Sequence, residues 1–453
     1  MMLFTTTWLQ TIFTQFKGHL KKQEWIHEVT TDSRTSTVNA LFVPLVGEYF
    51  DGHDFVHQAI DNGAIAILWD EKKALPSNIP NDIIVFFVAD PLASLQTLAK
   101  HYRELIQPIV VGITGSNGKT TTKDLVTSIV KTTYKTHFTH GNLNNHIGLP
   151  LTILSMSRDT EVLVLEMGMN DFGEIELLSN IAQPDYAMIV NIGESHIEFL
   201  GSRVGIAQAK LEIITGLKSE GCLFIDGDEE LLTKKYNHMT ISCGFKPGND
   251  LQIEHFTSKK KETTFQLSNG QTYTISLLGK HNVHNAAFAV ALGERLNIPY
   301  DNIQKGLSRV VPTSMRMEFV TGKNGVSIIN DAYNASPTSM KAAIEVVKNI
   351  KGFRKKILIL GDILELGSHS TELHQQVAET ITHPITAVFT YGKEAKIISH
   401  TVKTLSPDID SIHFQAKNDL IKHLRYYLHE DVLLLFKASR GMQFETFIKA
   451  LQH

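Results

Sequence analysis

A glycine-rich turn between an apolar run and a polar stretch constrains this chain more than any other feature. The stretch is Val110–Lys123, VVGITGSNGKTTTK. It predicts a buried strand, a tight turn and a helix, the unit from which parallel α/β sheets are built. Glycines let backbone N–H groups point inward around phosphate oxygens, and the dipole of the following helix favours the same anion. The turn therefore predicts a phosphate-binding loop in an α/β domain.

The side chains of the turn indicate a nucleoside triphosphate. We expect Lys119 to reach the β- and γ-phosphates, and the hydroxyl of Thr120 or Thr121 to ligate Mg²⁺. Gly112 stands one residue too early for the standard G-x-x-x-x-G-K-[ST] spacing, so the prediction rests on the strand–turn–helix pattern around the turn. The alternative is a strand–turn–helix with an incidental lysine. The predicted loop comprises Gly115, Ser116, Asn117, Gly118, Lys119, Thr120 and Thr121, and the predicted cofactors are ATP and Mg²⁺.

The length of the chain predicts three domains. It has 453 residues, and a domain takes about 150. Near-continuous apolar runs such as Val162–Glu166 predict parallel strands covered on both faces, while Asn269-Gly270 predicts an antiparallel hairpin. Leu9, Ile12, Phe13 and Phe16 fall at helical spacing. We expect an α/β fold with an N-terminal α/β domain (1–105), a central domain with a mainly parallel sheet (106–312) and a C-terminal α/β domain (313–453).

Composition excludes several functional classes. A net charge of −4 provides no basic field, so we expect no nucleic-acid partner. The two cysteines are too few for a disulfide framework and have no metal-ligand spacing. No apolar run has the length of a membrane span, and the N-terminus lacks a basic leader. We therefore expect a cytoplasmic protein.

Two polar residues follow apolar strands and indicate a divalent cation. Glu166 ends one run in VLEMG, and His196 follows another in NIGESH. Because Mg²⁺ prefers oxygen ligands, His196 indicates a second metal, an outer-shell role or a structural histidine. For Lys210, in AQAKLEI, the sequence alone favours an exposed lysine on an amphipathic helix.

Several asparagines are ambiguous from the sequence. The loop GNLNNHIGLP is a structural turn, or it contacts the γ-phosphate or the incoming acyl group through Asn142, Asn144, Asn145 or His146. Asn282, in GKHNVHN, caps a helix or presents its amide to a purine edge.

The last third of the chain carries further charged residues. Arg316 neutralises the γ-phosphate from a second domain or forms a surface salt bridge, and Asp331 follows in NDAYNASP. Two acids and two basic residues around one cleft would suit a zwitterionic substrate. They are Asp362, Glu365, Lys437 and Arg440.

Taken in order, these motifs closely resemble those of the Mur ligases of peptidoglycan synthesis. The resemblance covers the whole chain, through TDSR, GEYFDGHDF, GSNGKTTTK, GNLNNHIGLPLT, LEMGMN, NIGESH, AKLEI, GKHNVHN, RME, DAYNASPTSM, LGDILELG and KASRGM. The chain departs from the family pattern at Ser336, where many relatives carry asparagine, and at Ala438, where glycine is common.

The resemblance implies a role for each motif. The N-terminal domain would hold a UDP-sugar, the central domain would be the ATPase, and the C-terminal domain would be Rossmann-like. Lys119, Lys210, Arg316 and Asn145 would be catalytic, and Lys210 would be carbamylated, since many Mur ligases carry this modification. Metal ligands would be Thr120, Glu166, His196 and carbamylated Lys210, and the nucleotide would meet Asn282, Asn285, Arg316 and Asp331. The remaining substrate contacts would come from Asp32, Ser33, Arg34, Gly47, Asp51, His53, Asn142, Asn334, Asp362, Glu365, Lys437 and Arg440.

The reaction implied is ATP-driven amide formation through an acyl phosphate, in a monomeric bacterial enzyme. LGDILELG favours the member that adds D-Ala-D-Ala to UDP-MurNAc-tripeptide. The neighbouring member adds one diamino acid and carries DNPR, which this chain lacks. A folylpolyglutamate synthetase-like ligase is disfavoured by DSR and DGHDF. A nucleotide-dependent regulatory module without ligation is the alternative from another class.

Overall fold

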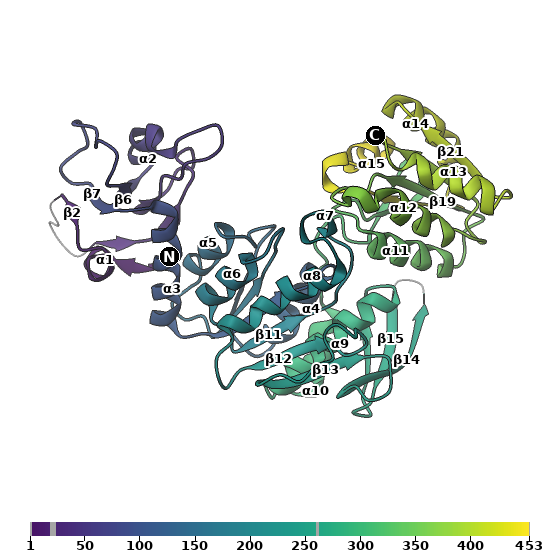
Figure 1. The fold of residues 1–453 in the computed structure, drawn as a ribbon, viewed down its shortest axis with the longest axis horizontal. Coiled ribbons are helices and arrows are strands. Elements are labelled where there is room, and N and C mark those ends of the chain that lie inside the picture. The colour runs from purple at the N-terminus through teal and green to yellow at the C-terminus, as the bar shows by residue number, and fades with distance from the viewer. Residues whose placement is uncertain (1, 19–23, 260–261, 453) are drawn as a thin grey trace.

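Three large β-sheets, one in each part of the chain, organise the molecule (Figure 1), and a two-stranded sheet pairs β1 (Phe4–Thr5) with β3 (Trp25–Ile26) near the N-terminus. The computed structural model describes residues 2–18, 24–259 and 262–452. The N-terminal, central and C-terminal sheets have five, nine and six strands. The predicted α/β fold class with three parts is confirmed. The predicted boundaries after residues 105 and 312 stay predictions.

A small, mostly parallel sheet forms the N-terminal part. Its elements are β1 (Phe4–Thr5), α1 (Thr6–Ile12), β2 (Phe16–Lys17), β3 (Trp25–Ile26), β4 (Glu28–Thr30), β5 (Ala40–Phe42), the 3-10 helix η1 (Gly52–Phe55), α2 (Val56–Asp61), β6 (Ala64–Asp70), β7 (Ile84–Val88) and α3 (Pro91–Ile106). The strand order is β2-β7-β6-β5-β4. The helix predicted to include Phe16 is wrong at its end, because α1 stops at Ile12 and Phe16 pairs with Phe86 as an antiparallel edge strand. Pairing with the sheet prevails over the helical spacing of the apolar residues.

The central part is built on a parallel sheet extended by an antiparallel hairpin. Its strands are β8 (Ile109–Thr114), β9 (Thr136–Phe138), β10 (Val162–Glu166), β11 (Tyr186–Ile189), β12 (Cys222–Asp226), β13 (Met239–Gly244), β14 (Leu251–Lys259), β15 (Glu262–Leu267) and β16 (Thr272–Ile275). The order is β16-β15-β14-β13-β12-β11-β8-β10-β9, and only the β14-β15-β16 pairings are antiparallel. Strands β10 and β11 flank β8, so the polar residues after all three strands meet at one edge. The mainly parallel sheet and the hairpin are confirmed.

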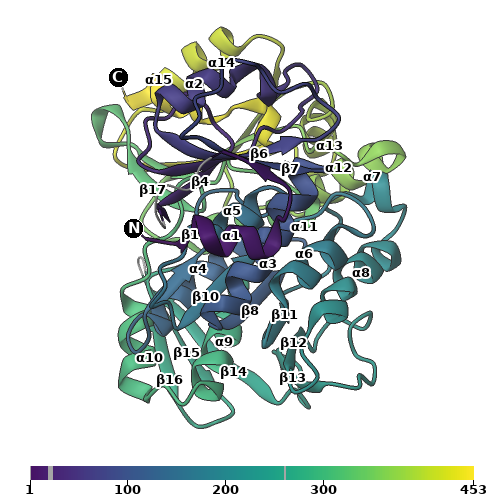
Figure 2. The ribbon, with the colours of Figure 1, turned by 90° about the vertical axis from the view of Figure 1, so that its left-hand side faces the viewer.

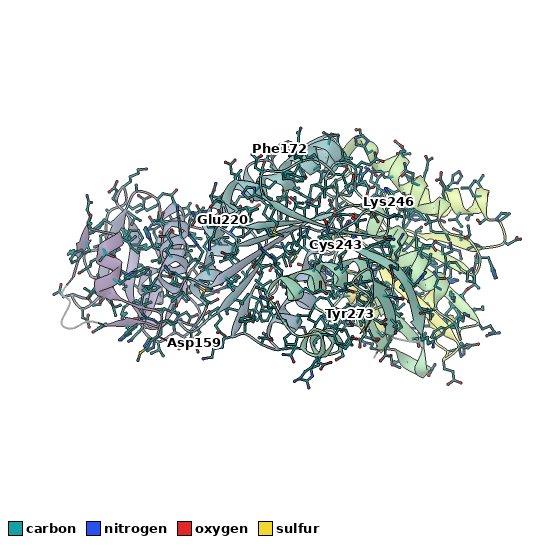
Figure 3. All side chains as sticks on the ribbon, turned by 90° about the horizontal axis from the view of Figure 1, so that it is seen from below. Asp159, Phe172, Glu220, Cys243, Lys246 and Tyr273 are labelled. Carbon is teal, nitrogen blue, oxygen red and sulfur yellow. The ribbon has the colours of Figure 1, made fainter. Side chains whose placement is uncertain are left out.

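Helices cover both faces of the central sheet (Figure 2). They are α4 (Lys119–Val130), α5 (Gly148–Leu154), α6 (Glu174–Ala182), α7 (Ile197–Leu200), α8 (Arg203–Leu211), η2 (Glu212–Gly216), α9 (Lys280–Arg295) and α10 (Tyr300–Ser308). The apolar residues of β8 and β10 are buried on both faces, which explains why their sequences do not alternate. In the view from below (Figure 3), Cys243 and Tyr273 lie in this central part; both cysteines are buried and unpaired.

The C-terminal part is a second α/β sheet. Its elements are β17 (Glu318–Thr321), η3 (Lys323–Gly325), β18 (Ser327–Asn330), α11 (Pro337–Asn349), β19 (Lys355–Gly361), η4 (Gly367–His369), α12 (Ser370–Glu379), β20 (Ala387–Tyr391), α13 (Lys396–Leu405), β21 (Asp410–Phe414), α14 (Lys417–Leu424), η5 (Arg425–Tyr427), β22 (Val432–Lys437), η6 (Arg440–Met442) and α15 (Glu445–Gln452). The order is β17-β18-β22-β19-β20-β21, parallel except for β17. Loops after β18, β19 and β22 therefore meet at one edge. That edge faces the central part, where α7 contacts η4.

Hydrogen bonds between parts of the chain help to hold these sheets in place. Tyr102 of α3 is buried and donates a hydrogen bond to the carbonyl of Met156 in the central part (3.0 Å). Thr313, in the connection to the C-terminal part, donates through N–H and Oγ1 to Asp124 of α4 (3.1 and 2.8 Å). Among the residues that the structure describes, no helix is both long and apolar enough to cross a membrane.

Candidate functional site

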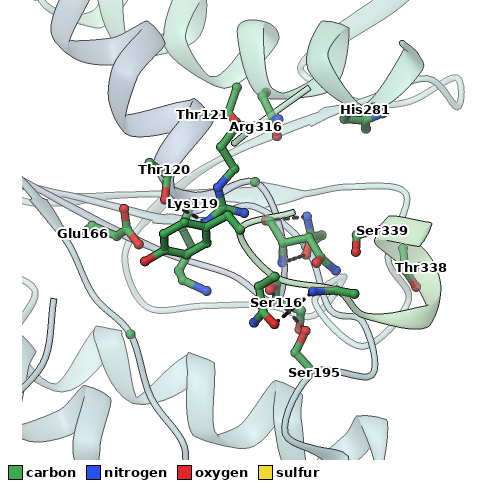
Figure 4. Close-up of a pocket in the computed structure, with 18 of the residues that line it drawn as sticks. Ser116, Lys119, Thr120, Thr121, Glu166, Ser195, His281, Arg316, Thr338 and Ser339 are labelled. Atoms are coloured by element: carbon green, nitrogen blue, oxygen red, sulfur yellow. Dashed lines mark hydrogen bonds between the residues drawn. The ribbon is translucent and has the colours of Figure 1, made fainter. Parts of the chain in front are cut away.

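A cavity of about 420 Å³ lies where the central and C-terminal strand ends face one another (Figure 4). The phosphate loop forms its floor, and residues after β10 and β11, the start of α9 and the start of α11 form its walls. In Figure 4, Glu166 lies beside Thr120 and Lys119, whereas His281 lies on the other side of the cavity. The strand ends of two different sheets thus supply one polar pocket.

The phosphate loop has the predicted strand–turn–helix geometry. Strand β8 ends at Thr114, and α4 begins at Lys119. Gly118 has φ of 78°, and a Cβ added there would lie 2.7 Å from Asn285 Oδ1. Glycine is required at this position both for its backbone conformation and for the close approach of α9.

Some polar side-chain atoms of the phosphate loop have a partner within the protein and others have none. Lys119 Nζ donates to the carbonyl of Gly115 (2.7 Å). Burial lowers the pKa of Lys119, while the nearby Glu166 carboxylate acts in the opposite direction. Ser116 Oγ and Asn117 Nδ2 are buried and find no hydrogen-bond partner within the described residues. Such groups suit a loop whose donors bind phosphate oxygens.

Glu166 has the environment expected of a ligand to a hard cation. Its carboxylate is 3% exposed, and Oε1 accepts a hydrogen bond from Asn144 (2.8 Å). Oε2 is buried and has no partner among the described residues. The described residues contain no cluster of three or more His, Cys, Asp or Glu that would form a cage. The unpartnered carboxylate oxygen fits Mg²⁺, which keeps waters and phosphate oxygens in its shell.

His196 stands at the boundary between the central and C-terminal parts. Its Nδ1 lies 2.7 Å from Glu365 Oε2, in the loop after β19. The contact to His196, opposed by burial, lowers the pKa of Glu365. His196 lines the main cavity and a second cavity of about 110 Å³.

Lys210 is buried, so the expectation of an exposed lysine is wrong. It lies on α8, is 1% exposed and forms no ion pair with any described residue. Burial, together with the nearby charge of Lys119, lowers the pKa of Lys210 well below its ordinary value. The amphipathic pattern misled because α8 is covered on the side that carries Lys210.

Asn282 and Asn285 lie within the first turns of α9 and line the cavity. The helix begins at Lys280 with Gly279 as its N-cap, so the N-cap interpretation of Asn282 is wrong. Asn282 Nδ2 donates to the Leu278 carbonyl (2.8 Å), and Asn285 Nδ2 donates to Asn282 Oδ1 (3.3 Å). The two amides form one buried polar group at the cavity wall.

Arg316 enters the cavity from the connection to the C-terminal part. Its Nη2 lies 3.5 Å from Thr120 Oγ1, and its guanidinium stacks 4.2 Å from the Tyr333 ring centroid. No carboxylate of a described residue forms a salt bridge with it, so the surface-bridge interpretation is wrong. Met315 and Met317 on either side have φ of 61° and 51°. This backbone turns the guanidinium toward the phosphate loop.

Asp331 and Lys437 form a buried ion pair at the ends of β18 and β22. Lys437 Nζ lies 2.5 Å from Asp331 Oδ2 and also donates to the Asn334 carbonyl (3.1 Å). Asp331 Oδ1 accepts from the backbone N–H of Met317 (3.1 Å). The pair therefore supports the backbone that presents Arg316.

The second cavity collects several predicted substrate contacts. It is lined by Asn334, Glu365 and Arg440, among others. Asp362 is not on its wall, because its carboxylate accepts hydrogen bonds from three backbone N–H groups, those of residues 393–395 (2.7–2.9 Å). Asn142 and Asn145 line the main cavity, and Asn145 Oδ1 also accepts from the backbone of residues 147 and 148.

The predicted UDP residues lie apart from both cavities, in the N-terminal part. Asp32 and Arg34 pair with each other at the surface (2.8 Å), and Ser33 donates to Gln58 (2.7 Å). Asp51 bonds to His53 and Lys73. Gly47 shapes the same loop through a hydrogen bond from its N–H to the Phe50 carbonyl (2.8 Å).

Sequence reasoning missed some polar residues that hold the site. Asn191 bonds the Asn117 backbone in both directions (2.9 Å each), and Ser336 Oγ donates to Asn117 Oδ1 (2.9 Å) across the two parts. Asn144, already a candidate in GNLNNHIGLP, holds Glu166. Asparagines directly after strands were the available signal; nothing local marked Ser336 as a partner of a loop more than 200 residues away.

Comparisons with known proteins agree with this arrangement. Three family profiles match consecutive regions: "Mur ligase family, catalytic domain" over residues 25–103, "Mur ligase middle domain" over 113–293 and "Mur ligase, glutamate ligase domain" over 315–440. Over 433 residues the chain is 48% identical to the UDP-N-acetylmuramoyl-tripeptide–D-alanyl-D-alanine ligase of Bacillus subtilis, covering 95% of this chain and 94% of that one. It resembles MurF from Acinetobacter baumannii with a TM-score of 0.87 at 30% identity, covering 99% and 98% of the two chains. MurF ligase from Thermotoga maritima, in complex with ADP, gives a TM-score of 0.83 at 29% identity and covers 94% and 97%.

Proposed function

The chain belongs to the Mur ligase family, and from that membership we propose the reaction it catalyses. It joins D-Ala-D-Ala to the terminal carboxylate of UDP-MurNAc-tripeptide with ATP as the energy source. The products are UDP-MurNAc-pentapeptide, a peptidoglycan precursor, together with ADP and phosphate. The enzyme is thus an ATP-dependent peptide ligase.

The convergence of two parts of the chain on one phosphate loop carries this proposal. Lys119 lies in the loop itself, and Arg316 reaches Thr120 from the connection to the C-terminal part (3.5 Å). A substrate carboxylate and the γ-phosphate, both anionic, must approach each other in the first step. Cationic groups fixed around that point lower the barrier by neutralising charge.

The chain's own residues then have separate tasks. The loop N–H groups and Lys119 hold the phosphates, and Arg316 neutralises charge as the acyl phosphate forms. Asn282 and Asn285 are placed to read the adenine, and Asp331 fixes the backbone beside Arg316. The cavity between the two parts keeps water from the acyl phosphate until the amine of the dipeptide attacks it.

A magnesium ion would be held by Thr120 and Glu166, with His196 nearby. The unpartnered Glu166 Oε2 is the observation that fits it. When bound, the metal supplies charge neutralisation and polarisation at the phosphates.

We include carbamylation of Lys210 in the proposal. A neutral amine forms a carbamate by bonding its nitrogen to the carbon of CO₂ and releasing a proton. Burial, together with the nearby Lys119, keeps the pKa of Lys210 well below its ordinary value and so supplies the neutral amine. The resulting anion would sit near the Lys119 cation and act as an oxygen ligand for the metal.

The second cavity is the proposed site of the dipeptide. Arg440 and Asn334 line this cavity and would bind the dipeptide carboxylate. Glu365 would bind the ammonium through Oε1, which forms no bond to a described residue. Lys437 supports this site through its hydrogen bond to the Asn334 carbonyl, and Asp362 supports it by anchoring the loop that carries Glu365. The UDP moiety belongs to the N-terminal part, around Ser33 and the loop from Gly47 to His53.

We also propose that the enzyme acts as a monomer in the bacterial cytoplasm. The reaction uses ATP, which the cytoplasm supplies.

Phosphate release from ATP tests the proposal. We expect turnover only when UDP-MurNAc-tripeptide and D-Ala-D-Ala are both present. Turnover with UDP-MurNAc-dipeptide and a diamino acid would instead place the chain at the neighbouring step. Binding of ATP without turnover for any pair would contradict ligation altogether.

A further inference from the structure

The contact between His196 and Glu365 joins the central part to the C-terminal part beside the proposed metal site. We propose that Glu365 is a positioning residue for His196, so that divalent-cation affinity depends on the C-terminal part being docked. The inference rests on the proposed metal site. It goes further by making a residue of a different sheet control that site.

The geometry of the pair supports this role. Glu365 Oε2 lies 2.7 Å from His196 Nδ1. The oxygen is close but poorly aligned with the ring N–H, so the contact is mainly electrostatic. The negative charge still favours the proton on Nδ1, which leaves the lone pair of Nε2 for a cation. Histidines that bind metals commonly have their second ring nitrogen held in this way, and the outer carboxylate also makes the ring a better ligand.

The loop that carries Glu365 is fixed within the C-terminal part before it meets His196. Asp362 anchors its start through three backbone N–H groups. The N–H of Ile363 donates to His374 Nε2 (3.2 Å), and the N–H of Leu364 donates to Ser439 Oγ (2.9 Å). A loop held at these points presents Glu365 in one place.

Both residues of the pair occupy an uncommon backbone conformation. The φ angles are 65° at His196 and 62° at Glu365. Non-glycine residues adopt this region rarely, and such strain concentrates at functional sites. The backbone N–H of Glu198 also donates to the Glu365 carbonyl (3.3 Å). A Cβ at Gly367 would lie 3.1 Å from Glu198 Cγ, so the two loops are in close contact.

No other ionisable side chain in the described part of the molecule forms an ion pair with His196. The carboxylate on this ring therefore comes only with the C-terminal part. By linkage, whatever docks that part strengthens cation binding, and the cation in turn favours docking. The metal site would thus be completed only when the cavity closes around the substrates.

Binding of Mn²⁺ to the full-length protein with a non-hydrolysable ATP analogue tests the inference without turnover. Electron paramagnetic resonance counts the free ion, and small-angle scattering reports compaction. We expect Glu365→Ala to weaken Mn²⁺ binding roughly 10-fold, and Glu365→Gln, which keeps an acceptor oxygen, to weaken it less. We expect His196→Ala to weaken it at least as much as Glu365→Ala.

A matched variant distinguishes this pair from docking in general. Thr338→Val removes the Thr338 Oγ1 hydrogen bond to Glu194 (2.5 Å) across the same boundary and keeps the backbone N–H donor. We expect it to weaken Mn²⁺ binding clearly less than Glu365→Ala does, because it acts only through docking. Wild-type affinity in Glu365→Ala, or an equal loss in Thr338→Val, would overturn the inference while the metal site stands. Wild-type affinity in His196→Ala would remove His196 from the metal site and overturn both.

Discussion

Two loops at the same boundary, Gly115–Thr121 and Asp362–Gly367, treat their polar groups in opposite ways. The first leaves Ser116 Oγ and Asn117 Nδ2 buried without partners among the described residues. In the second, the Asp362 carboxylate accepts three backbone hydrogen bonds, and two further N–H groups are bonded to His374 and Ser439. Burying an unpaired polar group destabilises a fold, so such a group indicates that a ligand binds there. A loop whose polar groups are all hydrogen-bonded within the protein indicates a structural role.

This difference separates the residues that react from those that position. The phosphate loop and its neighbours Glu166 and Lys210 are incomplete without ligands. The loop after β19 is anchored by hydrogen bonds within the C-terminal part. Its residue Glu365 reaches the central part, where it contacts His196. Substitutions in the first region should therefore affect catalysis, and substitutions in the second should affect stability first.

The largest effect is expected at Lys210. Lys210→Ala should abolish turnover, because it removes the proposed carbamate ligand, and short-chain carboxylic acids should restore part of the activity. Phosphate release with both substrates measures it, and urea unfolding checks that the buried substitution has not unfolded the protein. Lys218→Ala, at an exposed lysine paired with Asp185, is the control. Lack of rescue in a folded variant, or an unmodified Lys210 in a well-resolved structure, would contradict carbamylation.

A loss of roughly 100-fold or more in turnover is expected for Lys119→Ala, since a cationic donor to the transferring phosphoryl group is removed. Lys135→Ala, at an exposed lysine paired with Asp159, should retain normal turnover. Near-normal activity of Lys119→Ala would refute the phosphate assignment.

Asp362→Ala should lower the free energy of unfolding by about 3 kcal/mol, because three backbone donors lose a charged acceptor. Urea denaturation measures this change, and Asp419→Ala, at an exposed carboxylate of α14, serves as the control. Turnover per folded molecule should fall less than in Lys119→Ala. The opposite ranking, with a stable but inactive Asp362 variant, would break the comparison between the two loops.

The smallest effect is expected at Asp51, a satisfied carboxylate near the surface of the N-terminal part. Burial alone would raise its pKa, but Lys73 and the N–H and ring of His53 lower it to about 2. A lowered native pKa adds stability above the unfolded value of 3.8, and this stability is lost as the pH falls toward 2. Because the pair is partly exposed, Asp51→Asn should cost less than about 1 kcal/mol at neutral pH.

Urea unfolding of wild type and Asp51→Asn at two pH values checks this sign. The difference in unfolding free energy should be larger near neutral pH than at about pH 3. A difference that grows on acidification would show that the carboxylate is not stabilised by Lys73 and His53.

Most of the fold followed from local patterns in the sequence. Continuous apolar runs predicted β8 and β10, since strands buried on both faces leave no room for alternation. The turn at Gly115–Thr121 predicted the phosphate loop, because its glycines allow a tight turn and its lysine can reach phosphate, and neither property depends on distant residues. The prediction that Phe16 belongs to a helix was wrong, because Phe16 pairs in a sheet with Phe86, about 70 residues away along the chain.

Burial and contacts between distant segments came only from the tertiary structure. Lys210 lies on an ordinary amphipathic pattern, and only the covering of α8 makes it a buried amine. The sequence by itself determined the phosphate loop, the α/β sheets and the order of the motifs, because these depend on backbone conformation and on the spacing of apolar residues. The tertiary structure decided which charges meet: Arg316 with Thr120, Asp331 with Lys437, and Glu365 with His196. Electrostatic contacts depend on distance in space, and separation along the chain does not record it.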